Sequence, residues 1–517
     1  MALTDFTQQH PAIGGTVGGL FRDTANATPE AVALRCGDLR LSYGALNERV
    51  NRLANALASR NLVRGDRVAI LSENNIDYVV ILLAAAKLGL IVACVNWRSA
   101  AREIAANIGL TRPGFVFVSD AFADNLGDDV PCVRIGDELD RLIADGEAHE
   151  PAGEVASEDG LIILYTSGTT GRSKGALVSH RAMIARGLLM RADWAIRRTD
   201  GFIAWSPLFH MASADPTFAT LVQGGTVTIV EKYDPAAIAD ALTEHDVGWL
   251  VLMPGMIESL SDELERRNAR IKRVAAAGCM ANLVPAAQID RVTRLLNAPF
   301  LNSFGSSETG ITPASGNWIE VGEPIGNLGK LQNTACEIKL VGDDGELVEP
   351  GKVGEICLRS PTLFSGYWND VEATRAAFHD GWYHMGDAFY RDARGLLHFA
   401  DRKKYLIKSG GENIYPAEIE TVLRNADSIE DAVVVRRTDP IWGEVPVAFV
   451  VPAVDDLTKE DVLAQLDGKI ARFKMPKEVV LITPDEIERN PTGKIRRDIL
   501  EARAEVSSGA SASGDSA

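Results

Sequence analysis

Small hydroxyl side chains, glycines and one cation are gathered between Thr166 and Lys174, a segment that reads TSGTTGRSK. The backbone N–H groups of a glycine-rich loop can converge on an anion, while hydroxyl groups add hydrogen-bond donors and a lysine adds positive charge. The segment follows Leu161–Tyr165, an apolar run that predicts a buried strand. We therefore predict a phosphate-binding loop at the end of this strand.

A Walker-type loop and a turn without binding function are the two alternatives for this segment. A Walker-type loop requires four residues between its first glycine and a Gly-Lys-Ser/Thr triplet, whereas only Arg172 and Ser173 separate Gly171 from Lys174. A Ser/Thr/Gly-rich turn that binds nothing is not excluded by composition alone.

Two further segments carry side chains suited to phosphate chemistry. Asn302–Thr309 (NSFGSSET) places the carboxylate of Glu308 after two hydroxyl groups, and oxygen ligands of this kind suit Mg²⁺. The same Ser-Ser-Glu pattern is also typical of a helix N-cap. Asn490–Arg497 (NPTGKIRR) presents Lys494 after a Thr-Gly pair, where a lysine is by default a surface residue.

Alternating strand and helix signals predict the framework that positions these segments. A helix is predicted at 75–88, and strands at 67–71, 91–96, 202–205, 227–230, 249–253, 273–276 and 299–301. This alternation indicates a mostly parallel sheet covered by helices. Ligands bind beyond the carboxyl ends of such strands, so we expect one meeting point for the loops after Tyr165, Trp205, Met253, Ala276 and Leu301.

The two ends of the chain and the region after residue 321 do not show this alternation of strand and helix signals. Short runs at 338–341 and 354–359, separated by Gly/Pro/Asp turns, predict a small β-subdomain. The glycines at 14–19 lack the GxGxxG spacing and predict a flexible lead-in over residues 1–20. Residues 505–517 are rich in Ser, Gly and Ala and are predicted to be disordered.

The bulk composition limits the class of protein. With 517 residues the chain is too long for one core, and its 46% hydrophobic content is that of a globular protein. The net charge of −18 argues against nucleic-acid binding. Six cysteines lack metal-ligand spacing, and neither a secretory signal nor a run of 18 apolar residues occurs. We expect a cytoplasmic protein without integral membrane association, and homodimerisation stays open.

The motifs together resemble those of the adenylate-forming enzymes, and the resemblance spans roughly residues 20–503. The 166–174 loop matches the family's signature loop, with Ser173 where Pro is usual, and 302–309 resembles its YGxTE motif, with Phe304 for Tyr and Ser307 for Thr. Further matches follow in the family order: 383–387 (YHMGD) to the TGD-type motif, 401–404 (DRKK) to the hinge motif, 408–416 (KSGGENIYP) to the acyl-CoA synthetase loop, and 490–497 to the C-terminal catalytic motif.

The resemblance implies an α/β fold with two parts. The large N-terminal domain, residues 21–403, would contain two layered α/β subdomains and a small β-barrel-like subdomain at about 321–400. A smaller mobile α+β domain, residues 404–504, would rotate about Lys404 between the two half-reactions.

The resemblance also implies a role for individual residues. The catalytic residues would be Lys494, Glu308, Thr166 and His210, with Glu308 and Thr166 holding Mg²⁺. Contacts to ATP and AMP would come from Thr166, Ser167, Gly168, Thr169, Thr170, Gly171, Lys174, Gly278, Asn302, Ser303, Phe304, Gly305, Ser306, Ser307, Asp387, Arg402, Lys404 and Lys494. Coenzyme A would contact Lys408, Ser409, Gly410 and Gly411.

The implied reaction has two steps. ATP activates a hydrophobic carboxylic acid (fatty, aryl or alicyclic) to acyl-AMP with release of pyrophosphate, and the thiol of coenzyme A then takes the acyl group. Since a carboxylate and an α-phosphate are both negative, the protein must mainly orient them and neutralise their charge. Lys494 would bridge the two, and Asp387 and Arg402 would bind the ribose.

The acid should contact the segments 209–216, 253–255 and 277–279 and the surroundings of Ser303 and Thr312. Peptide synthetase adenylation domains have an Asp at the position of His210, which argues against an amino-acid substrate. His210 instead resembles the aromatic gate of acyl- and aryl-CoA ligases, or is a packed core histidine. Asp215 is either a pocket residue or unrelated to the pocket. Gly278 suggests room beside the acyl group, and apolar lining is expected from Met211, Met253 and Met256.

Three other functions are compatible with parts of this pattern. An acyl-AMP ligase would load a carrier-protein phosphopantetheine in place of coenzyme A. An oxygenase of the luciferase type would consume O₂ after adenylation, but nothing in the sequence requires it. An inactive adenylate-binding sensor would have no need of both Lys494 and Glu308, so their presence argues against it.

Overall fold

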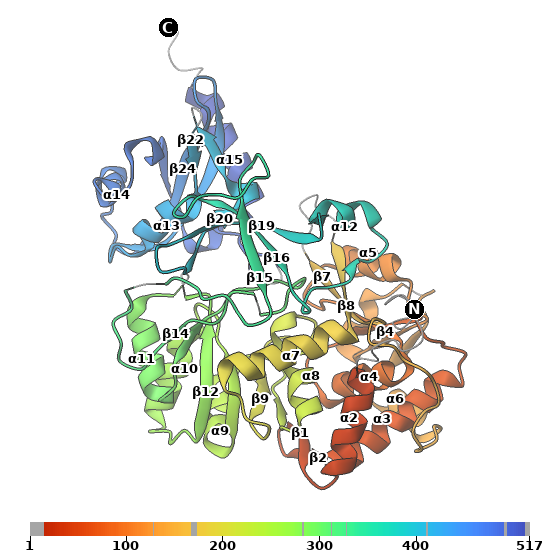
Figure 1. The fold of residues 1–517 in the computed structure, drawn as a ribbon. Coiled ribbons are helices and arrows are strands. Elements are labelled where there is room, and N and C mark those ends of the chain that lie inside the picture. The colour runs from red at the N-terminus through yellow and green to blue at the C-terminus, as the bar shows by residue number, and fades with distance from the viewer. Residues whose placement is uncertain are drawn as a thin grey trace, which may run out of the picture. The chain divides into compact units, whose positions relative to one another are not determined.

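The computed structural model describes residues 15–127, 129–166, 173–281, 284–311, 313–326, 328–409, 412–490 and 494–511. The chain forms two compact units (Figure 1). The first comprises residues up to Ile338 together with Leu358–Tyr383, and the second comprises Lys339–Cys357 and the chain from His384 onward. The boundary expected at residues 403 and 404 stays a prediction.

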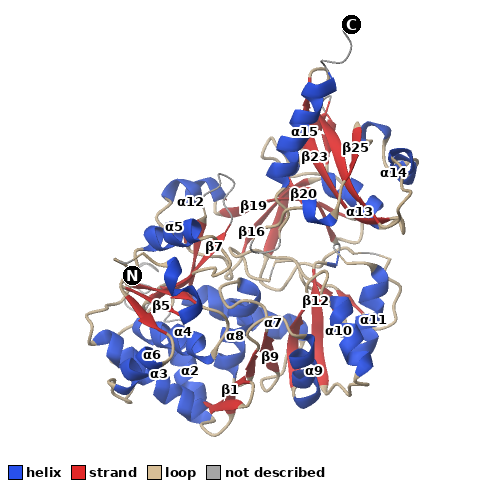
Figure 2. Cartoon of the chain, turned by 180° about the vertical axis from the view of Figure 1, so that it is seen from behind, coloured by secondary structure: helices blue, strands red, loops and turns tan. Residues whose placement is uncertain are grey.

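Two sheets with helices packed on them form the first unit, which confirms the predicted layered α/β fold (Figures 1 and 2). The eight-stranded sheet has the order β14 (Trp318–Ile319), β13 (Phe300–Asn302), β12 (Arg273–Cys279), β11 (Asp246–Val251), β9 (Gly201–Ala204), β10 (Val227–Ile229), β1 (Val32–Cys36) and β2 (Leu39–Ser42). All of its neighbouring strands are parallel except the two edge pairs.

The seven-stranded sheet of the first unit carries the predicted phosphate loop. Its order is β17 (Gly366–Tyr367), β8 (Lys174–Ser179), β7 (Gly160–Thr166), β4 (Ile91–Cys94), β3 (Arg67–Leu71), β5 (Phe115–Val118) and β6 (Cys132–Arg134). β7 therefore belongs to a different sheet from β9, β11, β12 and β13, so the loops that we expected to meet come from two sheets. Apolar periodicity identifies a strand but does not say which strand it pairs with.

The described helices of the first unit alternate with strands along the chain, except for α2, which precedes the first strand. They are α2 (Val17–Ala27), α3 (Tyr43–Ala58), α4 (Ile76–Leu88), α5 (Ala101–Thr111), α6 (Asp137–Ala144), α7 (His180–Trp194), α8 (Met211–Gln223), α9 (Pro235–Glu244), α10 (Ile257–Arg266), α11 (Ala286–Leu296) and α12 (Val371–Ala377). The predicted helix at 75–88 is α4, whose N-cap is Asn75 and whose C-cap is Gly89 in the left-handed conformation. Every residue from Tyr78 to Leu88 is buried, so α4 is a core helix.

The predicted flexible lead-in is wrong for residues 17–20, because these residues begin α2. Thr16 is the N-cap, and its hydroxyl accepts a hydrogen bond from the N–H of Gly19 at 3.1 Å. A Cβ atom on Gly18 would lie 2.9 Å from the Cα of Lys87. Gly18 thus lets α2 pack closely on α4. Its presence is explained by this packing, although a glycine in the sequence usually indicates flexibility.

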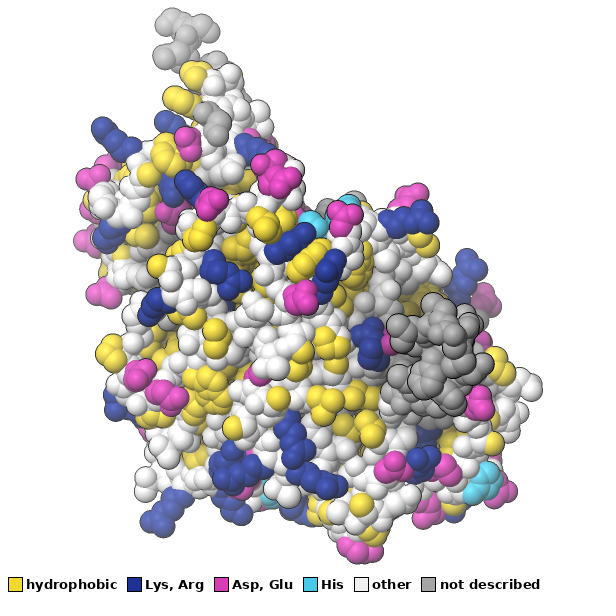
Figure 3. Space-filling model, in the orientation of Figure 1, with side chains coloured by type: hydrophobic (Ala, Val, Ile, Leu, Met, Phe, Trp, Pro, Cys, Tyr) yellow, Lys and Arg dark blue, Asp and Glu magenta, His cyan; other side chains and the backbone are white. Residues whose placement is uncertain are grey.

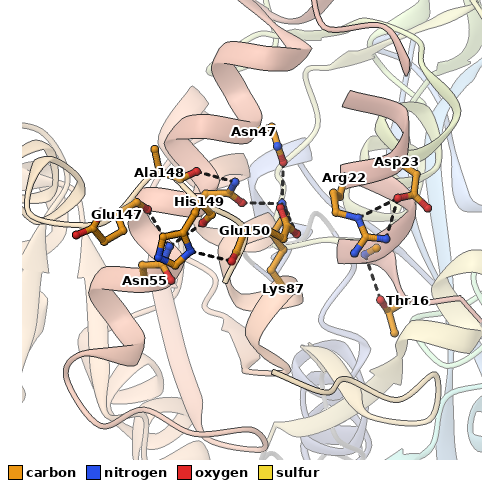
Figure 4. Close-up of polar contacts among 12 residues, drawn as sticks. Thr16, Arg22, Asp23, Asn47, Asn55, Lys87, Glu147, Ala148, His149 and Glu150 are labelled. Atoms are coloured by element: carbon orange, nitrogen blue, oxygen red, sulfur yellow. Dashed lines mark hydrogen bonds and ion pairs between the residues drawn. The ribbon is translucent and has the colours of Figure 1, made fainter. Parts of the chain in front are cut away.

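A buried lysine, Lys87 of α4, links helices α3 and α4 to Glu150, which lies in the segment after α6 (Figure 4). Its ammonium group donates to the side-chain oxygens of Asn47 and Asn51, both at 2.7 Å, and to the carboxylate of Glu150 at 2.7 and 2.8 Å. Asn55 adds two hydrogen bonds to carbonyl groups of the same segment. The Lys87 charge is therefore paired, as a buried charge must be.

The second unit contains strands of two sheets and three helices. One sheet has the order β22 (Glu412–Ile414), β21 (Ile407–Ser409), β24 (Gly443–Pro452), β23 (Ile429–Asp439), with β25 (Glu478–Leu481) beside β24. Its helices are α13 (Pro416–Arg424), α14 (Lys459–Leu466) and α15 (Arg497–Ser511). The other sheet has the order β15 (Glu337–Val341), β16 (Gly354–Arg359), β19 (Trp382–Arg391), β18 (Phe378–His379), with β20 (Leu397–Arg402) beside β19. Of these strands, β18 belongs to the first unit. The strands predicted at 338–341 and 354–359 are β15 and β16.

The disorder predicted from residue 505 is wrong up to residue 511, because these residues continue α15. The carboxylate of Glu505 accepts hydrogen bonds from the N–H and the hydroxyl of Thr438, at 2.7 and 2.8 Å. Ala504 is fully buried. These contacts hold the helix against β23, which a low-complexity composition does not reveal.

The face shown in Figure 3 carries charged side chains of both signs, with basic residues interspersed among acidic ones. No helix in the described part of the chain is long and apolar enough to cross a membrane.

Candidate active site

The ends of the predicted phosphate loop lie side by side. β7 ends at Thr166 and β8 begins at Lys174, and these two residues are paired across the antiparallel ladder. The Thr166 hydroxyl donates to the carbonyl oxygen of Lys174 at 3.4 Å. Ser167, Gly168, Thr169, Thr170 and Gly171 lie outside the described residues, so their phosphate contacts stay a prediction.

A tyrosine that sequence reasoning missed joins this loop to the Glu308 motif. Tyr367 lies in β17, the edge strand that pairs with β8, opposite Ala176. The Lys174 ammonium lies 4.8 Å from the centre of the Tyr367 ring, and the Tyr367 hydroxyl donates to Glu308 Oε1 at 3.0 Å. Lys174 and Glu308, which are far apart in the sequence, thus both contact one aromatic side chain.

The surroundings of Glu308 suit a carboxylate that keeps one oxygen for a ligand. The residue is 8% exposed, and its carbonyl oxygen accepts from the N–H of Phe364 at 2.8 Å. Burial and the Glu308 charge raise the pKa of Tyr367 well above its ordinary value, so its hydroxyl stays a donor. No described residue donates to Glu308 Oε2.

The donor set fits Mg²⁺ that arrives with a nucleotide. Mg²⁺ is usually held by one or two carboxylates together with phosphate oxygens and water, not by a cage of protein ligands. Among the described residues, no group of three or more His, Cys, Asp or Glu side chains is placed to hold a metal. Glu308 Oε2, and the hydroxyl of Thr166 at the end of β7, are the oxygens that would take part.

The rest of the Asn302–Ser307 motif is held by protein contacts. Asn302 is fully buried, with Oδ1 accepting from the N–H of Ala281 at 2.9 Å and Nδ2 donating to the carbonyl of Leu328 at 2.7 Å. Phe304 is also buried. At Gly305 a Cβ atom would lie 1.9 Å from the carbonyl oxygen of Gly310, so no other residue fits this turn. The Asn302 side chain, at the end of β13, therefore joins the segment after β12 to the segment after β14.

Lys330 is a second residue that sequence reasoning missed. Its side chain is fully buried, and its ammonium contacts Asn302 Oδ1 and, at 3.5 Å each, the carbonyl oxygens of Asn302 and Ser303. Burial lowers the pKa of Lys330 to about 7, although the nearby Cys279 raises it. Its neighbours in the sequence, a glycine and a leucine, do not distinguish a buried lysine from an exposed lysine.

The buried Lys330 predicts a pH dependence of stability. Its unfolded-state pKa is 10.5 and its folded-state pKa is about 7, so between these pH values the unfolded chain binds more protons. The free energy of unfolding should therefore rise with pH in this window, by up to about 1.4 kcal/mol per pH unit. Burial also raises the pKa of the neighbouring Cys279 thiol from 9.0 to about 12, so above about pH 9 this group lowers the free energy of unfolding as the pH rises. Comparison with a Lys330 variant that keeps Cys279 isolates the effect of the lysine.

Urea unfolding at pH 7 and pH 9 measures this effect when the wild type is compared with Lys330→Met. We expect the wild type to gain about 2 kcal/mol relative to the variant between these pH values. Parallel pH profiles for the two proteins would contradict the assignment.

The predicted acid-binding residues lie on β12, α8 and the loops beside them. His210 is the N-cap of α8, is only partly buried, and accepts at Nδ1 from the N–H of Ala212 at 3.1 Å. Gly278 is required by packing, because a Cβ atom there would lie 2.2 Å from the carbonyl oxygen of Leu301 on β13. The interpretation of Gly278 as room for the acyl group thus has no support from the structure. Thr312 lies outside the described residues.

The remaining predicted residues belong to the second unit. Asp387 and Arg402 are register partners on β19 and β20, with Arg402 Nε 3.4 Å from Asp387 Oδ1, so the two predicted ribose contacts lie together. Lys404 is exposed, with its ammonium 4.7 Å from the centre of the Tyr405 ring.

The predicted coenzyme A and catalytic lysine segments are also in the second unit. The N–H of Lys408 donates to the Glu444 carboxylate at 2.8 Å, and Ser409 is paired with Gly443. Gly410 and Gly411 lie outside the described residues. Lys494 is exposed, and its backbone N–H donates to Asn490 Oδ1 at 2.9 Å. The roles of all these residues stay predictions.

Comparison with known proteins gives a consistent result. The chain matches the model of the AMP-binding enzyme family over residues 21–368 and that of the AMP-binding enzyme C-terminal domain over residues 418–494. It is 35% identical to an indoleacetate–CoA ligase of Aromatoleum aromaticum, covering 92% of this chain and 95% of the relative. It is 32% identical to a feruloyl-CoA synthase of an Amycolatopsis species, covering 93% and 97%.

Solved structures resemble the fold over nearly the whole chain. One is an o-succinylbenzoate CoA synthetase of Bacillus subtilis in complex with its acyl-adenylate intermediate, with a TM-score of 0.83 and 27% identity over 93% of this chain and 97% of that one. The same enzyme in complex with ATP and magnesium ion has a TM-score of 0.83 and 26% identity, over 93% and 98% of the two chains.

Proposed function

The chain belongs to the AMP-binding enzyme family, and we infer that it is an AMP-forming acid–thiol ligase whose acid is aromatic. It activates a hydrophobic carboxylic acid with ATP, forming an acyl-adenylate and pyrophosphate. The thiol of coenzyme A then attacks the acyl carbon, which gives the thioester, AMP and a proton. ATP, Mg²⁺ and coenzyme A are the implied cofactor and co-substrates.

The arrangement of Lys174, Tyr367 and Glu308 is the observation that best supports this function. An ammonium group and a carboxylate with one oxygen not engaged by described residues both contact one tyrosine, at the end of the strand that leads into the 166–174 loop. Such a pair can neutralise a triphosphate with the lysine and hold its metal ion with the carboxylate.

Each residue in the proposed mechanism orients reactants or offsets charge. Lys174 would neutralise the departing phosphates, Glu308 and Thr166 would hold Mg²⁺, and Mg²⁺ when bound would supply further neutralisation of the phosphate charge. Lys494 bridges the attacking carboxylate and the α-phosphate. No enzyme nucleophile is needed, because in the second step the thiol of coenzyme A supplies the attacking atom.

The C-terminal part is proposed to act in both steps. Asp387 and Arg402, which lie together, are proposed to hold the ribose hydroxyls. Lys404 is proposed as the hinge of a domain formed by residues 404–504, and its exposure is compatible with that role. The segment Lys408–Gly411 is proposed to line the path of the pantetheine arm.

The aromatic nature of the acid is supported by the relatives. The indoleacetate–CoA ligase and the feruloyl-CoA synthase, at 35% and 32% identity, are both named for aromatic acids. His210, which is only partly buried at the start of α8, is proposed as the residue beside the carboxylate.

A panel of aryl, straight-chain and alicyclic acids tests the proposal. We expect pyrophosphate release with arylacetic or arylpropenoic acids, and thioester formation only when coenzyme A is added. Transfer to a phosphopantetheinylated carrier protein in place of coenzyme A would identify the carrier-loading alternative. Tight adenylate binding without pyrophosphate release from any acid would identify an adenylate-binding sensor.

A further inference from the structure

Arg186, a buried residue of α7, joins three segments of the proposed active site. Its side chain is 1% exposed, and each of its three nitrogens donates to a different segment of the chain. Nη1 contacts the carboxylate of Asp215 at 3.2 and 3.3 Å, Nη2 donates to the carbonyl oxygen of Ser307 at 3.1 Å, and Nε donates to the carbonyl oxygen of Thr362 at 3.0 Å. The planar guanidinium group fixes the directions of these contacts relative to each other.

The first of these segments is α8, whose N-cap is His210 and which carries Asp215 in its second turn. Asp215 is 1% exposed, and its only described ion-pair partner is Arg186. α7 and α8 approach closely, since a Cβ atom on Gly187 would lie 2.9 Å from the Cβ of Ala219. Asp215 is thus not a free pocket residue, and it fixes the helix whose N-terminus carries His210.

The other two segments lead to Glu308. Ser307 directly precedes Glu308, and Thr362 begins the stretch that continues through Phe364, whose N–H bonds the Glu308 carbonyl, to Tyr367, which bonds the Glu308 carboxylate. The stem of Arg186 also packs on Gly310, where a Cβ atom would lie 2.7 Å from the Arg186 Cδ. One guanidinium group therefore holds both the backbone beside Glu308 and the segment that supplies its hydrogen-bond donor.

Stability alone is a weak reason for burying this pair. Removing two charges from water is costly, and replacing a buried ion pair by apolar side chains of similar volume is often neutral or stabilising. Burial indeed raises the pKa of Asp215, while the Arg186 charge opposes that rise. What apolar side chains cannot supply is a donor for the Ser307 and Thr362 carbonyls.

We propose that Arg186 and Asp215 are positioning residues that hold the acid-binding helix α8 at a fixed place relative to the Ser307–Glu308 motif. The proposal rests on the proposed function, because α8 and Glu308 are there assigned to the acid and to the metal-bound nucleotide. Attack of the acid on the α-phosphate requires the two reactants to be aligned, and a misplacement of about 1 Å can cost on the order of 10²-fold in rate. The pair therefore acts on the first half-reaction through the alignment of its two substrates.

The double variant Arg186→Met/Asp215→Leu separates positioning from stability. We expect a folded protein with a lowered thermal midpoint, because the Ser307 and Thr362 carbonyls lose their donor, but without the larger cost of an unpaired buried charge, since both charges are removed together. The kcat for acid-dependent pyrophosphate release should fall about 10- to 100-fold, with a much smaller change in the KM for ATP. Arg186→Lys should recover part of the lost kcat, since an ammonium group can keep the Asp215 contact and one carbonyl contact. A folded double variant with wild-type kcat would overturn the proposal.

A second ion pair in the first unit provides the matched control. Arg273, the first residue of β12, pairs with the buried Asp200 at the start of the strands, away from their carboxyl ends. Arg273→Met/Asp200→Leu removes the same charges and should leave kcat unchanged. An equal fall of kcat in both double variants would overturn a specific role of Arg186 and Asp215.

Two further comparisons keep the test decisive. If the Arg186→Met/Asp215→Leu protein does not fold, Arg186→Lys tests the proposal in its place. A folded Arg186→Lys protein with the kcat of the wild type would overturn the proposal. Pyrophosphate release by the wild type tests the premise separately. If the wild type releases no pyrophosphate with any acid, the proposed function is contradicted. If the double variant releases pyrophosphate as fast as the wild type, only the positioning role is contradicted.

Discussion

Replacing Lys494 with alanine is expected to reduce acid-dependent pyrophosphate release by on the order of 10²- to 10³-fold, the usual effect of removing one group that stabilises transition-state charge. Transfer of the acyl group from supplied acyl-adenylate to coenzyme A should change far less. The reason is that two anions must meet only in the first step, where an ammonium group between them offsets their repulsion. In the second step the attacking thiol meets an activated acyl carbon.

The two half-reactions are measured separately, by pyrophosphate release without coenzyme A and by thioester formation from synthetic acyl-adenylate. Lys469→Ala is the matched control, because Lys469 is another exposed lysine of the second unit that has no proposed role. Equal losses in both half-reactions would count against the bridging role of Lys494.

The framework of the fold is predictable from the sequence because its signals are local. β3 (Arg67–Leu71) and β16 (Gly354–Arg359) have the predicted bounds, since each is an apolar run bounded by turn-forming or charged residues. The helix α4 (Ile76–Leu88) lies within the predicted range 75–88, with Asn75 as its N-cap and Gly89 as its C-cap. The pairing of strands is not local, so the sequence does not show that β7 lies in a different sheet from β9, β11, β12 and β13.

The residues that assemble the candidate site were only partly predictable. Thr166, Lys174 and Glu308 belong to motifs whose residue types indicate phosphate chemistry, and the structure places Lys174 and Glu308 in contact with Tyr367. Tyr367 itself lies in a short edge strand, Gly366–Tyr367, whose partner strand cannot be read from its neighbours in the chain.

Buried charges were the hardest feature to predict. Arg186 lies on a helix whose sequence gives no reason to expect that its guanidinium is 1% exposed, and the neighbours of Lys330, a glycine and a leucine, do not indicate that the lysine is buried. Charged side chains are mostly exposed in proteins, so a sequence without structural context favours the wrong assignment at such positions. Their partners, Asp215 and Asn302, lie in other segments of the chain.

The second large effect is expected at Glu308. Glu308→Gln keeps an oxygen that can accept from the Tyr367 hydroxyl, which now lies 3.0 Å from Oε1, but it removes the negative charge. If Glu308 holds Mg²⁺ beside the phosphates, the kcat for pyrophosphate release should fall by on the order of 10²- to 10³-fold. A titration with MgCl₂ should also show that a higher concentration is needed for half-maximal activity, because a neutral amide is a weaker ligand than a carboxylate.

Tyr367→Phe is the variant that separates charge from orientation at this site. It leaves the Glu308 charge in place, keeps the aromatic ring beside Lys174, and removes one hydrogen bond to the carboxylate, so a loss of about tenfold is expected. Equal losses in Tyr367→Phe and Glu308→Gln, with the same MgCl₂ dependence as the wild type, would mean that Glu308 only supports the local fold. A large loss confined to Glu308→Gln requires its charge to act on the reactants themselves, since the hydrogen bond to Tyr367 and the burial of the side chain are then nearly unchanged.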